Sequence, residues 1–333
     1  CHWQEVRERT ENLGAAIVGA MRQIEIANPD TLYGVLSMFS SQKWTNKAIL
    51  NDSKIRDLIE HLSKRKLGNK DYPADLMGDA YEILLKKFAD DSKAQAGEFY
   101  TPRSVVRLLV HILDPQPGET VYDPACGSGG MLIEAIRYMH DDSLCCGSIF
   151  GQEKNVVNAA IAKMNLFLHG ASDFNVMQGD TLRDPKILQG GNIAKFDCVI
   201  ANPPFSLENW GATEWSSDKY KRNIYGTPSD SCGDYAWIQH MICSMSSGKG
   251  RMAVVMPQGI LFRGNQEAEI RKQLVESDLI EAVVTLGDKL FYGTGLSPCF
   301  LIIRRMKQAH HSGRILMIDG SKILTQKRAQ NIL

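Results

Sequence analysis

The sequence lacks the long apolar runs and the net charge that mark several classes of protein. It has no run of about 18 apolar residues and no basic-then-apolar start, so neither a membrane span nor a signal peptide is predicted. Lysine plus arginine number 38, and aspartate plus glutamate also number 38. A chain without a net positive field must obtain any affinity for nucleic acid locally or from a partner. We expect a cytoplasmic protein.

The cysteines show no metal-binding or disulfide pattern. They form no C-x-x-C pair and no cluster with histidine at the spacing of metal ligands. We therefore predict small buried thiols, with no metal site and no disulfide framework. The eight cysteines are Cys1, Cys126, Cys145, Cys146, Cys198, Cys232, Cys243 and Cys299.

The chain does contain enough apolar material, 44% of 333 residues, for one large α/β domain and a smaller one. Residues 5–26, 52–63 and 73–88 carry apolar side chains at three- and four-residue spacing, which predicts helices. From about residue 96, short β-rich runs alternate with helical patterns. This alternation predicts a doubly wound, mostly parallel α/β sheet whose ligands sit at the carboxyl ends of the strands. We expect a helical domain over residues 1–95 and a Rossmann-like domain of about seven strands over residues 96–333.

The elements of the second domain follow from these runs. The expected strands are residues 120–122, 148–152, 175–178, 196–201, 252–256, 280–286 and 299–304. The expected helices are residues 104–113, 131–139, 155–169, 235–245 and 266–275. Residues 206–233 lack a periodic pattern and are expected to form a functional loop or lid. The start at Cys1 and the polar stretch before Leu333 indicate that both ends are cuts in a longer polypeptide.

A glycine-rich turn, Asp123 to Gly130, directly follows the first expected strand and opens a helix. Its glycines let the backbone come close to a ligand, and the amides at the helix start attract an anionic group such as a carboxylate. A dinucleotide fingerprint would need a glycine where Leu132 stands, so a pyrophosphate cofactor fits less well. A purely structural tight turn is the alternative interpretation.

Carboxylates also follow the next two expected strands. Glu153 is placed to accept both hydroxyls of a ribose, although it could instead cap the helix that starts near residue 155. Asp180 could accept from an adenine amino group, or could be a turn aspartate. Three consecutive strand ends that carry Asp123, Glu153 and Asp180 favour a ligand site over coincidence.

The most specific motif, Asn202-Pro203-Pro204-Phe205, follows the fourth expected strand. An exocyclic amine on a base is a poor nucleophile because its lone pair is delocalised into the ring. If the Asn202 side-chain carbonyl and the Pro203 main-chain carbonyl each accept one N–H, the nitrogen becomes more tetrahedral and its lone pair points at a methyl donor. The prolines fix the turn, and Phe205 offers a face on which an extruded base stacks. Loop punctuation after a buried strand is the alternative.

Upstream, residues 97–103 lead into the first expected helix of the second domain. Thr101 is expected to be the N-cap, with Pro102 at the first helical position. Nothing in this segment alone indicates more than a helix start.

With Glu98-Phe99-Tyr100-Thr101-Pro102, the turn from Asp123 to Gly130, and Asn202 to Phe205 in this order, the chain closely resembles the modification subunit of type I restriction–modification systems. The likeness covers nearly the whole chain. It implies that Asn202, Pro203, Pro204 and Phe205 hold a target adenine in double-stranded DNA for methylation at N6. It implies S-adenosyl-L-methionine as cofactor, contacted by Glu98, Phe99, Tyr100, Thr101, Pro102, Arg103, Asp123, Gly127, Ser128, Gly129, Gly130, Glu153 and Asp180.

The resemblance also implies partners. Members of this family work as two modification subunits on one specificity subunit, which reads the DNA sequence, and a restriction subunit joins them when cleavage is possible. A separate specificity subunit would explain the missing positive field. The family's chains carry a carboxyl-terminal helical extension, which we expect to be absent here.

Other activities remain as alternatives. A cytosine C5 methyltransferase needs a Pro-Cys nucleophile after the fourth strand, where Asn202 to Phe205 stand instead; the only Pro-Cys pair, Pro298-Cys299, begins an apolar strand. Methylation of cytosine N4, of RNA or of protein glutamine shares the amine chemistry. A non-catalytic scaffold that binds DNA and partners is the alternative from another class.

The loop over residues 206–233 mixes aromatic and basic side chains. We hypothesise that they help hold the extruded DNA strand, with a solvated mobile loop as the alternative. The residues concerned are Trp210, Trp215, Lys219, Tyr220, Lys221 and Arg222.

Overall fold

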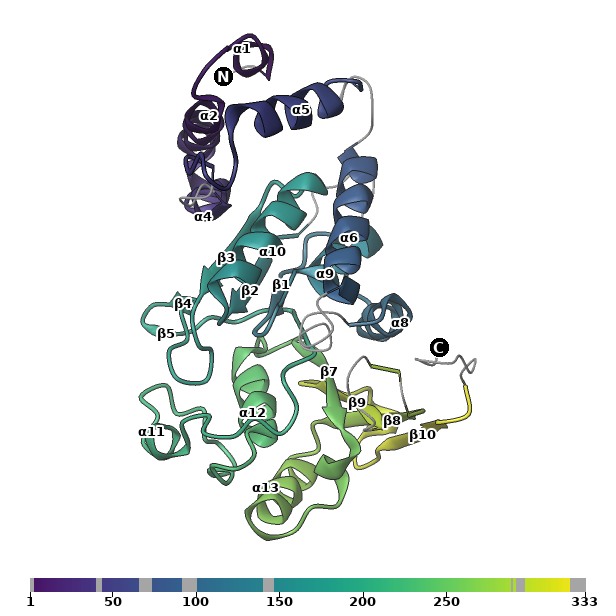
Figure 1. Cartoon of the computed structure of the whole chain (residues 1–333). Helices are drawn as coiled ribbons and strands as arrows, with labels where there is room; N and C mark the ends of the chain where they lie inside the picture. The colour runs from purple at the N-terminus through teal and green to yellow at the C-terminus, as the bar shows by residue number, and fades with distance from the viewer. Residues whose placement is uncertain are drawn as a thin grey trace. The chain divides into compact units, whose positions relative to one another are not determined.

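The computed structural model describes residues 3–39, 44–65, 74–91, 101–139, 147–288, 290–291 and 297–323 (Figure 1). Its internal contacts divide the chain into two compact units. One comprises Cys1–Leu84 with Ala160–Ser172, and the other comprises Leu85–Ala159 with Asp173–Leu333. Within the described residues, every helix is too short or too polar to span a lipid bilayer.

The first unit is helical over its described residues. Its elements are α1 (Trp3–Arg7), α2 (Leu13–Ala27), α3 (Pro29–Leu32), α4 (Val35–Phe39), α5 (Asp52–Leu62), part of α6 (Ala74–Asp91) and most of α10 (Val156–Leu168). The helix expected over residues 5–26 is two helices, because the chain turns at Asn12, whose φ of 53° is left-handed. A small core of Val6, Leu13, Ile55 and Ile59 joins α1, α2 and α5.

The second unit is built on one eight-stranded sheet, with the strand order β10-β8-β9-β7-β6-β1-β2-β3. Strand β9 runs antiparallel to β7 and β8, and every other neighbouring pair is parallel. The strands are β1 (Val121–Asp123), β2 (Ile149–Glu153), β3 (Phe174–Gln178), β6 (Cys198–Ala201), β7 (Arg251–Pro257), β8 (Ile280–Leu286), β9 (Pro298–Arg304) and β10 (Leu316–Gly320). The predicted doubly wound, mostly parallel sheet is confirmed.

The strand count differs from the expected seven because β10 was not predicted. Its consecutive apolar residues Leu316, Met317 and Ile318 are all exposed, so the segment shows no alternation of buried and polar positions. A separate small hairpin, β4 (Leu188–Gln189) with β5 (Asn192–Ile193), was also missed because each strand has only two residues.

Helices cover both faces of this sheet. Along β7, the alternate residues Met252, Val254 and Met256 lie in a core shared with α12 (Asp234–Ser244) and α13 (Asn265–Glu276). Helices α8 (Arg103–Leu113) and α9 (Gly130–Met139) contact the central strands but contribute nothing to that core, so they pack on the opposite face.

The described cysteines are free thiols. Cys126, Cys198, Cys232 and Cys299 are buried, as the sequence predicts, and Cys243 is half-buried. Burial raises the pKa of Cys232 and of Cys299 to about 12, so both stay protonated at neutral pH. Cys1, Cys145 and Cys146 lie outside the described residues.

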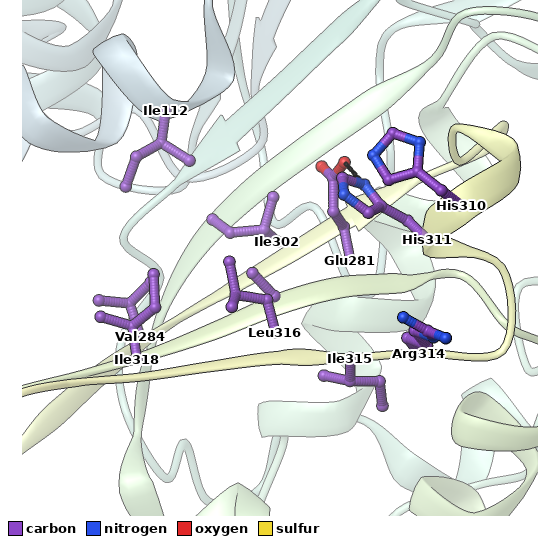
Figure 2. Close-up of a pocket in the computed structure, with 11 residues that line it drawn as sticks. Ile112, Glu281, Val284, Ile302, His310, His311, Arg314, Ile315, Leu316 and Ile318 are labelled. Atoms are coloured by element: carbon purple, nitrogen blue, oxygen red, sulfur yellow. Dashed lines mark ion pairs between the residues drawn. The ribbon is translucent and has the colours of Figure 1, made fainter.

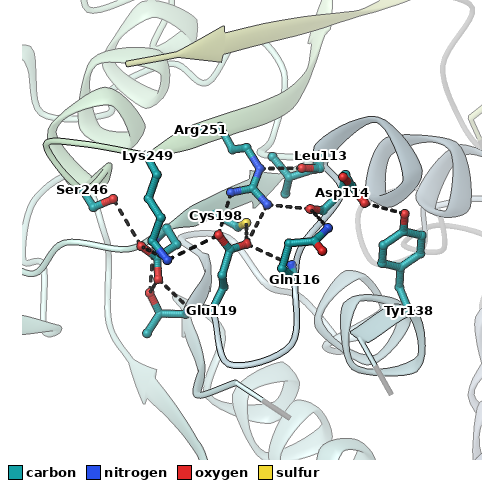
Figure 3. A network of polar contacts seen from close by, with 11 residues as sticks. Leu113, Asp114, Gln116, Glu119, Tyr138, Cys198, Ser246, Lys249 and Arg251 are labelled. Atoms are coloured by element: carbon teal, nitrogen blue, oxygen red, sulfur yellow. Dashed lines mark hydrogen bonds and ion pairs between the residues drawn. The ribbon is translucent and has the colours of Figure 1, made fainter. Parts of the chain in front are cut away.

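A polar network ties the amino ends of the central strands together (Figure 3). The guanidinium of Arg251, the first residue of β7, pairs with the Glu119 carboxylate at 2.6 Å and donates to the main-chain oxygens of Leu113 and Asp114. Burial alone would raise the pKa of Glu119. The hydrogen bonds from Arg251 and from the Gln116 amide, with the Arg251 charge, lower it instead to about 2.

Candidate functional site

The predicted strand-end residues come together at one edge of the sheet. Strands β6, β1, β2 and β3 are parallel neighbours, so Asn202, Asp123, Glu153 and Asp180 follow one another along their carboxyl ends. The chain proceeds from β1 to β2 and β3 on one side, while β6 lies on the other side of β1. This reversal of strand order is the place where open α/β sheets bind ligands.

The glycine-rich turn needs its glycines. Gly127 has a φ of 54° and Gly129 a φ of 82°, in the left-handed region where a side chain is strained. A Cβ added at Gly130, the first residue of α9, would meet no atom of the described residues within 4 Å, so that part of the chain leaves room beside the turn.

Glu153 links this turn to the next strand connection. Its Oε2 accepts from the Gly127 amide at 3.0 Å, and its Oε1 accepts from the Asn155 amide at 2.7 Å. Oε1 therefore caps the start of the following helix, as the alternative interpretation predicts, and Oε2 binds the glycine-rich turn. Because a carboxylate oxygen accepts more than one hydrogen bond, acceptor capacity remains at both atoms. Burial is the main cause that raises the pKa of Glu153.

Asp123 is only 2% exposed, and its Oδ1 accepts from the Ala125 amide at 2.9 Å. Burial, with a smaller contribution from the charge of Glu153, raises the pKa of Asp123 to about 8, although the Ala125 hydrogen bond lowers it in part. Burial makes the charged form of this carboxyl group costly, so a ligand that brings a positive charge or hydrogen-bond donors to the edge of the sheet would stabilise it.

Asp180 makes the contacts of a turn aspartate. Its Oδ1 accepts from the amides of Leu182 and Arg183 at 3.2 and 3.3 Å, and its Oδ2 lies 2.9 Å from the Lys154 ammonium. These bonds hold the carboxylate at the same edge as Glu153, two residues beyond the end of β3.

Asn202 has an asymmetric environment. Its Nδ2 donates to the Thr101 hydroxyl at 2.9 Å. Its Oδ1 is buried and has no hydrogen-bond partner among the described residues. An unsatisfied buried acceptor costs about 1–3 kcal/mol, so such an atom commonly marks a place where a ligand supplies the donor.

The rest of the turn presents one face to solvent. Pro203 is buried, Pro204 is exposed and Phe205 is half-buried. The Phe205 ring meets the Phe291 ring edge-on, with 6.1 Å between the centroids. Part of the Phe205 ring is therefore available to a ligand beside Asn202.

The turn is braced by residues that the sequence did not single out. Ser206 has a left-handed φ of 50°, and its amide donates to Asp234 Oδ1 at 2.7 Å. Arg263 pairs with Asp234 Oδ2 at 2.6 Å and donates to the Ser206 hydroxyl at 3.1 Å. No spacing in the sequence relates residues 206, 234 and 263, so only the tertiary structure reveals the brace.

The start of α8 differs from the expectation. The N-cap is Pro102, with no side-chain cap, and α8 begins at Arg103. Thr101 does not cap the helix, because its hydroxyl accepts from Asn202 instead. Glu98, Phe99 and Tyr100 lie outside the described residues.

The hypothesis of an aromatic and basic DNA-facing lid is wrong for three of its residues. Trp210 and Trp215 are each 2% exposed and Arg222 is 1% exposed. The Arg222 guanidinium stacks on Trp215 at 4.4 Å and donates to the main-chain oxygens of Thr181 and Leu182. The segment is packed and includes α11 (Ala212–Ser216), so these side chains stabilise it from within. Lys219 and Lys221 are exposed and keep the hypothesis open.

A cavity of about 540 Å³ lies elsewhere, over β8, β9 and β10 (Figure 2). Apolar side chains such as Ile112, Ile302 and Leu316 line one end, and His310 and His311 lie at the other. Its described lining includes none of the predicted site residues. No group of three or more His, Cys, Asp or Glu side chains suited to a metal ion occurs in the described part of the chain.

Comparison with known proteins agrees with this geometry. The family model of the N-6 DNA methylases matches residues 72–333. The MjaVII type I restriction enzyme methylase subunit of Methanocaldococcus jannaschii is 35% identical over 332 residues, which cover 96% of this chain and 55% of that protein. The chain thus spans about half the length of this relative.

Solved structures give the same assignment. The type I restriction-modification system methyltransferase subunit from Streptococcus thermophilus has a TM-score of 0.75 and 32% identity, covering 85% of this chain and 59% of that one. A Listeria monocytogenes structure described as a class I S-adenosylmethionine-dependent methyltransferase has a TM-score of 0.64 at 16% identity, covers 88% of this chain and 84% of that one, and bears on the fold alone. The chain therefore belongs to the N-6 DNA methylase family.

Proposed function

We propose that this chain is the catalytic part of a DNA adenine-N6 methyltransferase. It transfers a methyl group from S-adenosyl-L-methionine to the exocyclic amine of an adenine swung out of the duplex. The observation that carries the proposal is the Oδ1 of Asn202 beside Pro203, at the carboxyl end of β6, which is buried and has no partner among the described residues. An acceptor held without a donor fits the N–H of an exocyclic amine.

The residues near Asn202 fit the cofactor. The remaining acceptor capacity of Glu153 suits ribose hydroxyls, and the open space at Gly130 admits a ligand against the backbone of the turn. We assign the cofactor contacts to Glu98, Phe99, Tyr100, Pro102, Arg103, Asp123, Gly127 to Gly130, Glu153 and Asp180, and leave out Thr101, whose hydroxyl accepts from Asn202. When bound, S-adenosyl-L-methionine supplies an electrophilic methyl group on a sulfonium.

The chain's own residues then act on the amine. Asn202 Oδ1 accepts one N–H and the Pro203 carbonyl accepts the other, which orients the nitrogen lone pair. Both hydrogen bonds strengthen as positive charge develops on the nitrogen, so they stabilise the transition state more than the bound substrate. The half-buried Phe205 supplies a stacking face for the base, and such stacking contributes about 1–3 kcal/mol.

DNA binding in this proposal requires a partner subunit. With 38 basic and 38 acidic residues, the chain has no overall positive field. We therefore assign sequence recognition to a specificity subunit, with two modification subunits on each, and include a restriction subunit where the system cleaves DNA. A relative whose solved structure concerns the complex assembly of a type I system, at 25% identity and a TM-score of 0.69, supports partner subunits.

The test is nucleoside mass spectrometry on DNA from a methylation-free host. The complete polypeptide that carries this chain is expressed with a specificity subunit, either unchanged or as Asn202→Ala. We expect N6-methyladenine from the unchanged protein and a loss of about a hundredfold or more in the variant, because one transition-state acceptor is gone. The matched control is Asn192→Ala, in the exposed hairpin strand β5, which should retain methylation.

Three other results would overturn the proposal. N4-methylcytosine would mean that the target base is wrong. Methylated RNA or protein glutamine, in samples whose DNA carries no methylated base, would mean that the substrate class is wrong. No methyl transfer to any of these would favour a scaffold.

A further inference from the structure

The Thr101 hydroxyl lies where it can control the Asn202 amide. The two residues are 101 positions apart in the sequence, yet Asn202 Nδ2 donates to Thr101 Oγ1 at 2.9 Å. Thr101 precedes α8, and a threonine at a helix start commonly turns its hydroxyl to the first free amides. Here the helix has no side-chain cap, so the hydroxyl is available to Asn202.

This contact occupies one end of the Asn202 amide. A primary amide carries two N–H donors on one side and one carbonyl acceptor on the other. With Nδ2 held by Thr101, the acceptor Oδ1 is left buried and unpaired within the described part of the chain. The Thr101 hydroxyl thus anchors the Nδ2 end of the side chain, and the Oδ1 end is the one that remains for a donor of the ligand.

We propose that Thr101 is a positioning residue that anchors the Asn202 side chain through Nδ2, so that Oδ1 is held in place for the target amine. It acts through Asn202 and touches neither the adenine nor the methyl group. This inference rests on the function proposed above. It differs from the role implied by the family resemblance, in which Thr101 contacts the cofactor.

The experiment compares three variants in the complete complex of the chain with its specificity subunit. Thr101→Val keeps the shape of the side chain and removes the hydroxyl, while Thr101→Ser keeps the hydroxyl. Thr213→Val makes the same chemical change at an exposed position of α11. For each, we measure kcat and KM for DNA, the Kd for S-adenosyl-L-methionine by calorimetry, and the Tm.

We expect Thr101→Val to lower kcat about ten- to a hundredfold, because an amide that has lost its anchor no longer holds the nitrogen in line with the methyl group. The KM for DNA, the Kd for the cofactor and the Tm should stay close to the values of Thr213→Val. Thr101→Ser should recover kcat to within about threefold of the unchanged protein, since its hydroxyl still accepts from Nδ2.

Several outcomes overturn the inference. An unchanged kcat in Thr101→Val would show that the hydroxyl does not position Asn202. A cofactor Kd that rises in proportion to the loss of rate would assign Thr101 to the cofactor. Equal losses of rate in the valine and serine variants, including a loss through misfolding of both, would show that the hydroxyl is not the determinant. If the unchanged protein and Thr213→Val both lack methyltransferase activity, the proposed function itself fails.

Discussion

At the scale of residues, this chain places polar groups in a buried edge without satisfying them locally. Asn202 Oδ1 has no partner among the described residues, and Asp123 is 2% exposed with a carboxyl pKa raised to about 8. Each arrangement reduces the stability of the empty protein, since desolvation of a polar atom or of a charge is costly. Both lie at the carboxyl ends of neighbouring strands, where a ligand can restore the lost interactions.

The raised pKa of Asp123 predicts a pH dependence of stability. Its value rises from 3.8 to about 8, so between these values the folded chain binds more protons than the unfolded chain. This contribution therefore stabilises the fold at low pH and is lost as the pH rises towards 8, with a slope of up to about 1.4 kcal/mol per pH unit.

We expect Asp123→Asn, which stays neutral, to flatten the dependence of unfolding free energy on pH between 5 and 8. Urea denaturation of the unchanged chain and of the variant, in the absence of cofactor, measures the difference. Parallel curves for the two proteins would contradict the assignment.

At the scale of elements, the segment between β6 and α12 behaves as a packed structure. Trp210 and Trp215 meet edge-on with 5.5 Å between their ring centroids, and the Arg222 guanidinium covers Trp215. Asp234, the first residue of α12, holds the start of this segment through the Ser206 amide. The position of Phe205 therefore depends on α12 and on the segment beyond β7 that carries Arg263.

Removal of the Asp234 brace should affect both stability and rate. Asp234→Ala leaves the Ser206 amide and the Arg263 guanidinium without their shared carboxylate, and we expect a loss of about 3 kcal/mol in unfolding free energy. This value is at the lower end of the range for removing one partner of a buried ion pair, because the Arg263 side chain is 29% exposed and can be hydrated.

Asp234→Asn is the matched variant, since its amide oxygen still accepts from Ser206 while its charge is lost. Its loss of unfolding free energy should be about half of the loss in Asp234→Ala, and its methylation rate should be higher than that of Asp234→Ala. Urea denaturation and methylation assays measure the two effects. Full activity in Asp234→Ala would show that the brace does not position the turn.

At the scale of the whole molecule, the two ends of the central strands carry different groups of polar residues. The carboxyl ends carry the candidate site. The amino ends carry the network of Arg251, Glu119 and Lys249, which links the end of α8 to β1 and β7 (Figure 3).

Arg251→Met tests the stabilising end. It leaves Glu119 as a buried charge that keeps the Gln116 amide and the exposed Lys249 ammonium but loses its buried cation, and two carbonyls lose their donor. We expect a loss of about 3–5 kcal/mol in unfolding free energy at neutral pH. Addition of Glu119→Gln should recover part of this loss, because the uncompensated charge is then removed.

The pH dependence of the unchanged chain gives a second measurement of the same pair. The folded pKa of Glu119 is about 2, below its ordinary value of 4.5. Its contribution is fully present above pH 4.5 and is lost as the pH falls towards 2. Acid titration should therefore destabilise the unchanged chain more steeply than Arg251→Met. Equal acid sensitivity would contradict this account.

The sheet and the edge of the candidate site were predictable from the sequence. The seven predicted strands, the Asp123 to Gly130 turn and the Asn202 turn all depend on local patterns. Because parallel strands place their carboxyl ends together, the topology alone brings Asp123, Glu153, Asp180 and Asn202 to one edge. Strand β10 was not predicted because its exposed apolar residues show no alternation of buried and polar positions.

The side chains that support the candidate site could be identified only from the folded chain. The local sequence predicts Thr101 as a helix cap, yet its hydroxyl accepts a hydrogen bond from Asn202, a residue 101 positions away. The sequence predicts Arg222 and the two tryptophans in an exposed lid, yet they are buried. The guanidinium is compensated there by its ion pair with Asp218 at 2.7 Å, by main-chain acceptors and by stacking on Trp215. Such contacts join residues far apart in the sequence, and no local periodicity or turn chemistry records them.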